Sequence, residues 1–281
     1  VRLPIGIDRV LYESFEIVME ASSSRIDWRY LLAKPTDRRY AAVEAMVTSA
    51  GGALHTLPDA EDGAMDADGN LVFIESLVLQ DQTAGFNCSG FAKWIVDGLY
   101  KPRTGTYTDI DVLKSKHLDY RGSSLASFYE DERDPYFGLD WSRNLARMMI
   151  SLDSGVPFSE IDPEAADVRD TAYARYTEDV GFPVARLPIV LYDLAMTEPG
   201  HFYIASLNRD FGSSPSLHQH THIAVLFPYF SSNGEYRVSV MERNVETGLQ
   251  SLLNRYNGDF VHLVRVEASS QYAPPIIEFR D

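Results

Sequence analysis

The stretch Phe86-Asn87-Cys88-Ser89-Gly90-Phe91-Ala92-Lys93-Trp94 contains the only cysteine in a chain of 281 residues. Gly85 and Asn87 favour a loop, and the apolar residues after Cys88 recur at helical spacing. The stretch therefore predicts a loop that turns into a buried helix with Cys88 at its N-terminus. Unpaired amide groups and the positive end of the helix dipole favour a thiolate there. The apolar helical positions are Phe91, Trp94, Ile95, Leu99 and Tyr100.

This cysteine also has a simpler interpretation. An unpaired cysteine is most often a small buried apolar residue without chemical function. Catalysis would require a base within hydrogen-bond reach of Cys88 and a further group that orients the base. The rest of the chain therefore decides between the two interpretations, according to whether it supplies both groups.

Composition limits the class of protein. An apolar content of 45% is enough for a sizeable core. The formal net charge of −16 argues against a nucleic-acid partner and against electrostatic docking on an anionic membrane. We expect no transmembrane segment, because no apolar run approaches the about 20 residues that a spanning helix needs. One cysteine excludes an internal disulfide.

Helical patterns dominate the first part of the chain. Apolar spacing predicts helices over 8–21, 37–47 and 141–149. The acidic segment 58–70 is expected to be a loop that leads into a strand over 71–79. Calcium binding is an alternative for this loop, but its oxygen ligands do not follow the spacing of an EF-hand.

Strand patterns dominate from about residue 186 onward. Alternating and β-branched residues predict strands over 201–205, 221–227, 236–242 and 260–266, with a hairpin loop at Ser231-Ser232-Asn233-Gly234. Helices followed by a meander of antiparallel strands predict an α+β fold, in which helices pack on a sheet.

His222 is the best placed of the seven histidines to act as the base, because it begins a strongly predicted strand. The hairpin loop places position 222 opposite about position 243 of the returning strand. Asn244 or Glu242 is then expected to reach His222 and fix its tautomer. The sequence leaves these two residues as alternatives.

His218, His220 and His222 occupy alternate positions, which would bring them to one face of an extended strand. This spacing suits a zinc site, with Cys88 as a possible further ligand, and the alternative is a structural polar edge. We favour a single catalytic histidine, His222, because residues 213–217 have the composition of a loop and leave His218 outside the strand.

Three segments resemble the NlpC/P60 family of cysteine peptidases. Residues 87–91 (NCSGF) are similar to the family pattern D-C-S-G-[FL]. Residues 198–204 (EPGHFYI) are similar to its P-G-D-L-V-F-F strand, and residues 222–226 (HIAVL) to its H-[VI]-[GA]-I-Y strand. The order of cysteine, histidine and polar residue also agrees with the family.

The resemblance implies a papain-like core over 81–281, with an N-terminal extension, residues 1–80, packed on it and a helical insertion over 101–185. It implies Cys88 as nucleophile, His222 as base, and Asn244 or Glu242 as the orienting residue. Asn87, Ser89 and His220 are the candidate substrate contacts. In relatives an aspartate stands where this chain has Asn87, and that aspartate and the following serine hold the free amine of a cell-wall peptide.

The implied activity is hydrolysis of an amide bond in a peptidoglycan stem peptide, outside the cytoplasm (periplasmic or secreted) and without a cofactor. The start at Val1 is consistent with a removed signal peptide, or with a trimmed sequence. One alternative is a papain-like amidase or acyltransferase acting on a lipid or small amide. Another is a binding protein with a vestigial dyad. This alternative would suit the departures from the family pattern at Asn87 and at His201, two positions where the family has aspartate. The sequence defines no oligomeric state.

Overall fold

The structure is a computed structural model. It describes residues 4–28, 31, 37–81, 84–117, 134–210 and 217–277. Its internal contacts divide the chain into two compact units, Val1–Asp37 and Arg38–Asp281. No helix among the described residues is both long and apolar enough to cross a lipid bilayer.

The described part of the first unit includes two short helices, α1 (Ile7–Tyr12) and α2 (Phe15–Ser22). The prediction of one helix over 8–21 is therefore wrong. Ser14 has an extended backbone, and its side chain accepts a hydrogen bond from the amide of Ile17 at 3.4 Å. A serine in this geometry is an N-cap, so it starts a new helix and interrupts the pattern.

The second unit is built on a six-stranded sheet in which every neighbouring pair of strands is antiparallel. The predicted α+β class is confirmed. In sheet order the strands are β3 (Phe182–Pro183), β8 (Phe260–Glu267), β4 (His201–Asp210), β5 (His218–Phe230), β6 (Tyr236–Glu242) and β7 (Val245–Thr247). A separate hairpin pairs β1 (Ala64–Met65) with β2 (Leu71–Val72).

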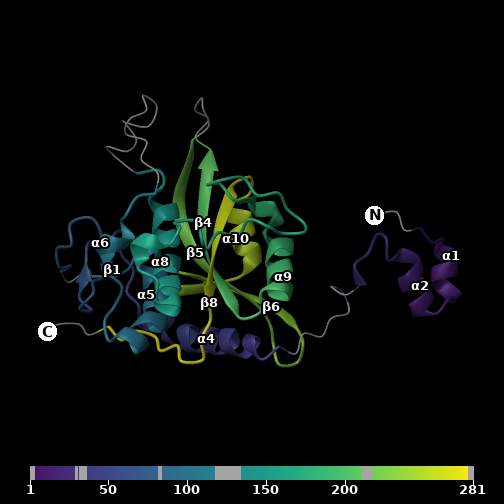
Figure 1. Ribbon diagram of the computed structural model, residues 1–281, viewed down its shortest axis with the longest axis horizontal. Helices are drawn as coiled ribbons and strands as arrows, with labels where there is room; N and C mark the ends of the chain where they lie inside the picture. Colours follow the sequence, from purple (N-terminus) through teal and green to yellow (C-terminus); the bar gives the residue numbers. More distant parts are fainter. Residues whose placement is uncertain are drawn as a thin grey trace. The chain divides into compact units, whose positions relative to one another are not determined.

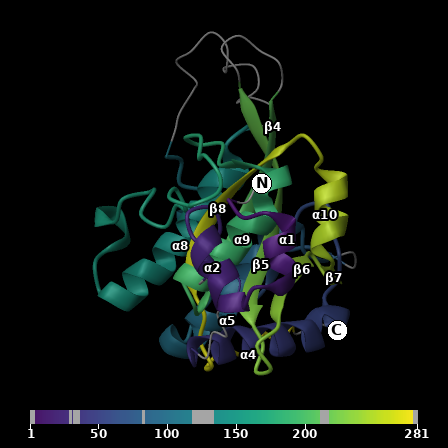
Figure 2. The same ribbon diagram turned by 90° about the vertical axis from the view of Figure 1, so that its right-hand side faces the viewer.

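Helices cover both faces of this sheet, with α5 and α8 on one side and α9 and α10 on the other (Figure 1). Figure 2 shows α10 beside β6 and β7, with α4 crossing one end of the sheet. The described α-helices of this unit are α4 (Arg39–Ala53), α5 (Cys88–Thr104), α6 (Ile110–Leu113), α8 (Phe137–Ser154), α9 (Leu187–Thr197) and α10 (Leu249–Arg255).

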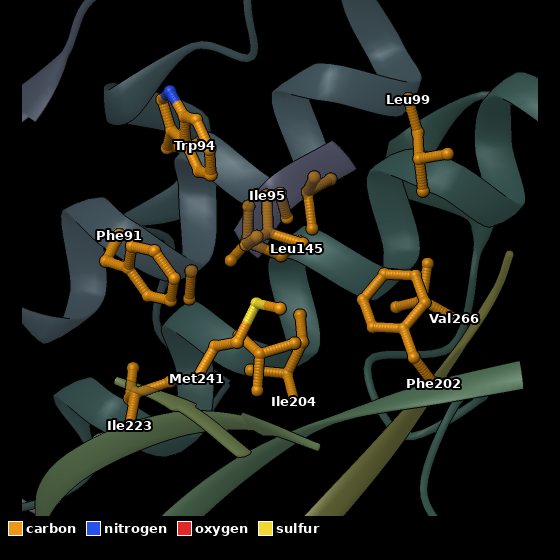
Figure 3. Packing of buried hydrophobic residues seen from close by; sticks show 14 of the residues in the cluster. Phe91, Trp94, Ile95, Leu99, Leu145, Phe202, Ile204, Ile223, Met241 and Val266 are labelled. Atoms are coloured by element: carbon orange, nitrogen blue, oxygen red, sulfur yellow. The ribbon is translucent and has the colours of Figure 1, made fainter. Parts of the chain in front are cut away.

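Alternation along the strands divides the core into two apolar clusters. In β4, Phe202 and Ile204 pack with α5 and α8, whereas Tyr203 and Ala205 pack with α9. Side chains of α5 meet those of the sheet directly in the first cluster (Figure 3). The N-terminus of α5, with Cys88, is thus anchored on the sheet by apolar packing.

Residues 101–185 contribute to this core. Trp141 and Leu145 of α8 are fully buried in the α5 cluster, and the indole of Trp141 donates a hydrogen bond to the carbonyl of Ser89 at 2.9 Å. Residues 38–80 also belong to the same compact unit, because α4 buries Val43 and Met46 in that cluster. The division of the chain therefore falls after Asp37, whereas the sequence suggested a boundary near residue 80.

Several predicted elements differ in length. The helix predicted over 37–47 runs from Arg39 to Ala53, and the helix predicted over 141–149 runs from Phe137 to Ser154. The strand predicted over 71–79 is limited to Leu71–Val72, because the chain turns back at Phe73, whose amide binds the carbonyl of Val78. Strand β6 has the predicted bounds, 236–242.

Candidate active site

The loop before α5 sets the position of Cys88, which is the first residue of that helix as predicted. Asn87 is the N-cap, and its side-chain oxygen accepts a hydrogen bond from the amide of Gly90 at 2.8 Å. A Cβ atom at Gly90 would lie 1.9 Å from the carbonyl oxygen of Gly63. Only glycine allows the first turn of the helix to approach the β1 hairpin this closely.

His222 and Glu242 lie just past the end of the β5–β6 ladder, whose last pair is Val225–Met241. Nε2 of His222 is 2.8 Å from Oε1 of Glu242. Of the two alternatives for the orienting residue, the structure therefore pairs Glu242 with His222. Asn244 instead donates from Nδ2 to the carbonyl of Leu57 at 3.2 Å.

The His222 side chain and the backbone of Ile223 both lie close enough to the Cys88 sulfur to lower the pKa of its thiol. Cys88 packs with the α5 cluster, whereas His222 lies on the opposite side of the sheet, against Tyr256. The two groups therefore meet where β5 and β6 stop pairing, a position open to side chains from both faces.

Charge and hydrogen bonding shift both groups in favour of their ionised forms. Burial alone would raise the pKa of the Cys88 thiol, but the hydrogen bond and charge of His222, with smaller effects from Ile223 and Arg243, lower that pKa. Burial alone would lower the pKa of His222, but Cys88 and Glu242 raise it to about 9. These opposite shifts favour a thiolate beside an imidazolium.

Glu242 is itself held by three donors. Besides His222, it accepts hydrogen bonds from Thr247 Oγ1 at 2.7 Å and from the guanidinium of Arg255. Burial would raise the pKa of this carboxyl group, but the three donors lower it to about 2. Tyr256 stacks on the His222 ring, with centroids 5.8 Å apart and planes 11° apart. The carboxylate and the imidazole are therefore both fixed in orientation.

Thr247, Arg255 and Tyr256 were not identified from the sequence. They lie on β7 and at the end of α10, which are three and seven residues long. Elements this short do not show a measurable periodicity. Thr247 follows Glu242 by 5 residues and Arg255 by 13, and such proximity along the chain is a weak indication of contact.

Strand β5 begins at His218, so the expectation that His218 lies outside the strand is wrong. The three alternate histidines nevertheless do not share one face, as a zinc site would require. Leu207 pairs with His222 and Asn208 pairs with His220, so Thr221 is an extra residue at a β-bulge. The bulge reverses the alternation and sends His220 and His222 to opposite faces. Among the described residues, no group of three His, Cys, Asp or Glu side chains is arranged to hold a metal ion.

His220 lies on the α8 side of the sheet and is almost completely buried. Its Nδ1 is 2.9 Å from Ser206 Oγ, and its Nε2 is 2.9 Å from the carbonyl oxygen of Asp179. Burial, together with the nearby His262, holds the pKa of His220 well below its ordinary value. Both ring nitrogens are thus bound within the protein, which leaves neither for a substrate.

The other two candidate substrate contacts lie next to Cys88. Asn87 is partly exposed, but its side-chain oxygen is engaged in the cap of α5. Ser89 is buried at the start of the same helix, and its carbonyl binds Trp141. In the acidic loop, Asp66 accepts hydrogen bonds from the amides of Asp68 and Asn70, so this carboxylate stabilises the turn before β2.

The arrangement thus combines a candidate nucleophile, a base and a buried carboxylate that orients the base. The amide of Cys88, in the first turn of α5, is a candidate donor to an oxyanion because such amides have no intrahelical acceptor. No known protein family, curated protein or solved structure matches the chain.

Proposed function

We propose that the protein is a cysteine hydrolase that cleaves an amide bond with the Cys88 thiolate. The observation that carries this proposal is the chain of contacts from Cys88 through His222 to Glu242. A structural cysteine would not need a protonated histidine beside it, nor a buried carboxylate to hold that histidine. Groups whose pKa values are shifted toward the ionised pair are typical of thiol hydrolases.

The reaction would proceed in two steps. First, the Cys88 sulfur attacks the amide carbonyl, a carbon–sulfur bond forms, and the carbon–nitrogen bond breaks as the His222 imidazolium gives its proton to the leaving amine. Second, His222 takes a proton from water, which attacks the thioester. A carboxylic acid leaves, and the Cys88 sulfur departs as the thiolate that enters the next cycle. Glu242 stabilises the imidazolium throughout.

The proposed substrate is a peptidoglycan stem peptide, hydrolysed outside the cytoplasm. Support for this substrate class comes from the resemblance of residues 87–91, 198–204 and 222–226 to the NlpC/P60 motifs. The same resemblance is the basis for proposing a papain-like core. The pairing of Cys88 at a helix start with His222 on the antiparallel sheet is compatible with that family.

A second candidate is an amidase or acyltransferase acting on an apolar amide. The segment after β2 exposes Phe73, Val78 and Leu79. It adjoins the loop before Cys88, because the side chain of Gln80 accepts a hydrogen bond from the amide of Gly85 at 2.6 Å. Large apolar side chains exposed on a segment that adjoins the loop before a candidate nucleophile favour an apolar acyl chain.

The proposal is tested by incubating the protein with peptidoglycan stem peptides and with acyl amides, and detecting released amines by mass spectrometry. Cys88→Ala should abolish turnover, whereas His55→Ala, at an exposed histidine outside the site, should not.

Iodoacetamide should alkylate Cys88 well below the ordinary thiol pKa of about 8.5. Turnover should fall as the pH rises through about 9, where His222 loses its proton. Alkylation only above the ordinary thiol pKa would contradict the proposal.

A further inference from the structure

Arg243 occupies the two-residue turn between β6 and β7, directly after Glu242 in the chain. Its φ is +53°, in the left-handed region that a residue with a Cβ atom rarely adopts. Turns at such positions usually carry glycine or asparagine. An arginine there is unexpected for the turn itself, and residues in such conformations cluster at functional sites.

The guanidinium of Arg243 is held from the other side of the site. Its Nη1 lies 3.0 and 2.9 Å from the two carboxylate oxygens of Asp59. Asp59 in turn forms a β-bridge with Phe86, two residues before Cys88. Arg243 therefore connects two segments of the site, the end of β6 that carries Glu242 and the segment that leads into Cys88. Its positive charge also acts on the Cys88 sulfur.

Most of the hydrogen-bonding capacity of Arg243 is unused. Within the described residues, its Nε and Nη2 have no partner, and 39% of its side chain is exposed. These two nitrogens form the edge of the guanidinium that binds a carboxylate with two parallel hydrogen bonds. By contrast, Arg209 uses its Nε and Nη2 on Asp259 and has no such edge free.

We infer that Arg243 binds a carboxylate of the substrate beside the amide that Cys88 attacks. This inference rests on the proposed function and narrows it to amides that carry a free carboxylate close to the bond that is cleaved. The uncharged Asn87, whose oxygen is already engaged by Gly90, agrees with a site that does not select a cationic amine. Asp59 occupies only Nη1, so it positions the guanidinium without blocking the free edge.

The test compares alkylation of Cys88 by iodoacetate, which carries a carboxylate, with alkylation by neutral iodoacetamide. In the native protein, the iodoacetate rate should saturate with concentration, whereas the iodoacetamide rate should rise linearly. Arg243→Gln should lower the iodoacetate-to-iodoacetamide rate ratio by about tenfold or more and remove the saturation, since a charge-assisted carboxylate contact is lost. Arg237→Gln, at an exposed arginine on β6 that pairs with Glu235, should leave the ratio unchanged.

A second variant separates binding from folding. Arg243→Gly removes the guanidinium but suits the left-handed turn, so it should fold at least as well as the native protein and show the same loss of iodoacetate preference. An unchanged ratio in both variants would overturn the inference and leave the proposed function intact. An iodoacetate rate that stays linear in the native protein would also overturn it, because the charge would then act only at long range. If neither reagent reacts with Cys88 below the ordinary thiol pKa, the proposed function itself fails.

Discussion

Two histidines on β5, only two positions apart, lie in opposite environments. His222 is partly exposed, with 17% of its side chain accessible, and it contacts Cys88 and Glu242. His220 is buried on the other face, bonded to Ser206 and to a backbone carbonyl. The pKa of His222 is raised to about 9, whereas the pKa of His220 is lowered well below its ordinary value.

The surroundings of His220 extend the contrast. Arg143, fully buried, pairs with Asp167 and Asp179 at 2.8 Å, and His262 lies 3.2 Å from Asp167. Burial would raise the pKa of Asp167, but His262 and Arg143 hold it well below its usual range. Polar groups enclosed in this way fix a fold through their mutual contacts, although Arg143 Nη1 and His262 Nδ1 are buried without a hydrogen-bond partner among the described residues. Around His222, by contrast, the ionised pair lies at a partly exposed position next to the only thiol, so it can exchange protons with a substrate.

The largest effect is expected from exchanging the two histidines for alanine, one at a time. His222→Ala removes the base and should lower turnover by about 10³- to 10⁴-fold, and it should also lower the free energy of unfolding below about pH 9, because the raised pKa of His222 contributes to stability there. His220→Ala should leave the turnover of the folded protein close to native but lower the free energy of unfolding by about 1–3 kcal/mol, since it leaves buried partners unsatisfied. Turnover and urea unfolding, measured on both variants, test these two predictions. Loss of turnover in a stably folded His220→Ala protein would show that the two environments are not functionally distinct.

An intermediate effect is expected from Glu242→Gln, which keeps the shape of the side chain but removes its charge. Without the carboxylate the imidazolium is less stable, so turnover should fall by about 10²-fold or more. The pH above which turnover declines should also move below the native value of about 9. A pH–rate profile measures both changes, and Glu246→Gln on β7 is the matched control.

The same variant has a pH-dependent effect on stability. The raised pKa of His222 stabilises the native protein fully below its unfolded value of 6.5, and this contribution is lost as the pH rises through about 9. The lowered pKa of Glu242 stabilises it above its unfolded value of 4.5, and this contribution is lost as the pH falls through about 2. Glu242→Gln should therefore destabilise the protein most between pH 4.5 and 6.5. A destabilisation that grows above pH 9 would contradict the His222–Glu242 ion pair.

The sequence predicts most of the site around His222, but it does not predict the β-bulge that separates His220 from His222. The helix start at Cys88 and the strand 236–242 follow from local patterns that no other interaction overrides. The hairpin loop spans 231–235, one residue more than expected. The predicted partner position, about 243, was approximate enough to include Glu242. The bulge at Thr221 leaves the alternating histidines unchanged in the sequence, so only the pairing of β5 with β4 reveals it.

The smallest effect is expected at Asn87, which links the site back to the start of α5. Asn87→Ala removes the cap on the amide of Gly90 and should lower the free energy of unfolding by about 1 kcal/mol. Asn87→Asp keeps the cap, because aspartate is an equally good N-cap, but places a negative charge next to Cys88. A charge of the same sign disfavours the thiolate, so the pH midpoint of Cys88 alkylation by iodoacetamide should rise in Asn87→Asp and change less in Asn87→Ala. An unchanged midpoint in Asn87→Asp would mean that the helix start contributes to the position of Cys88 and not to its ionisation. His222 would then be the main source of the lowered thiol pKa.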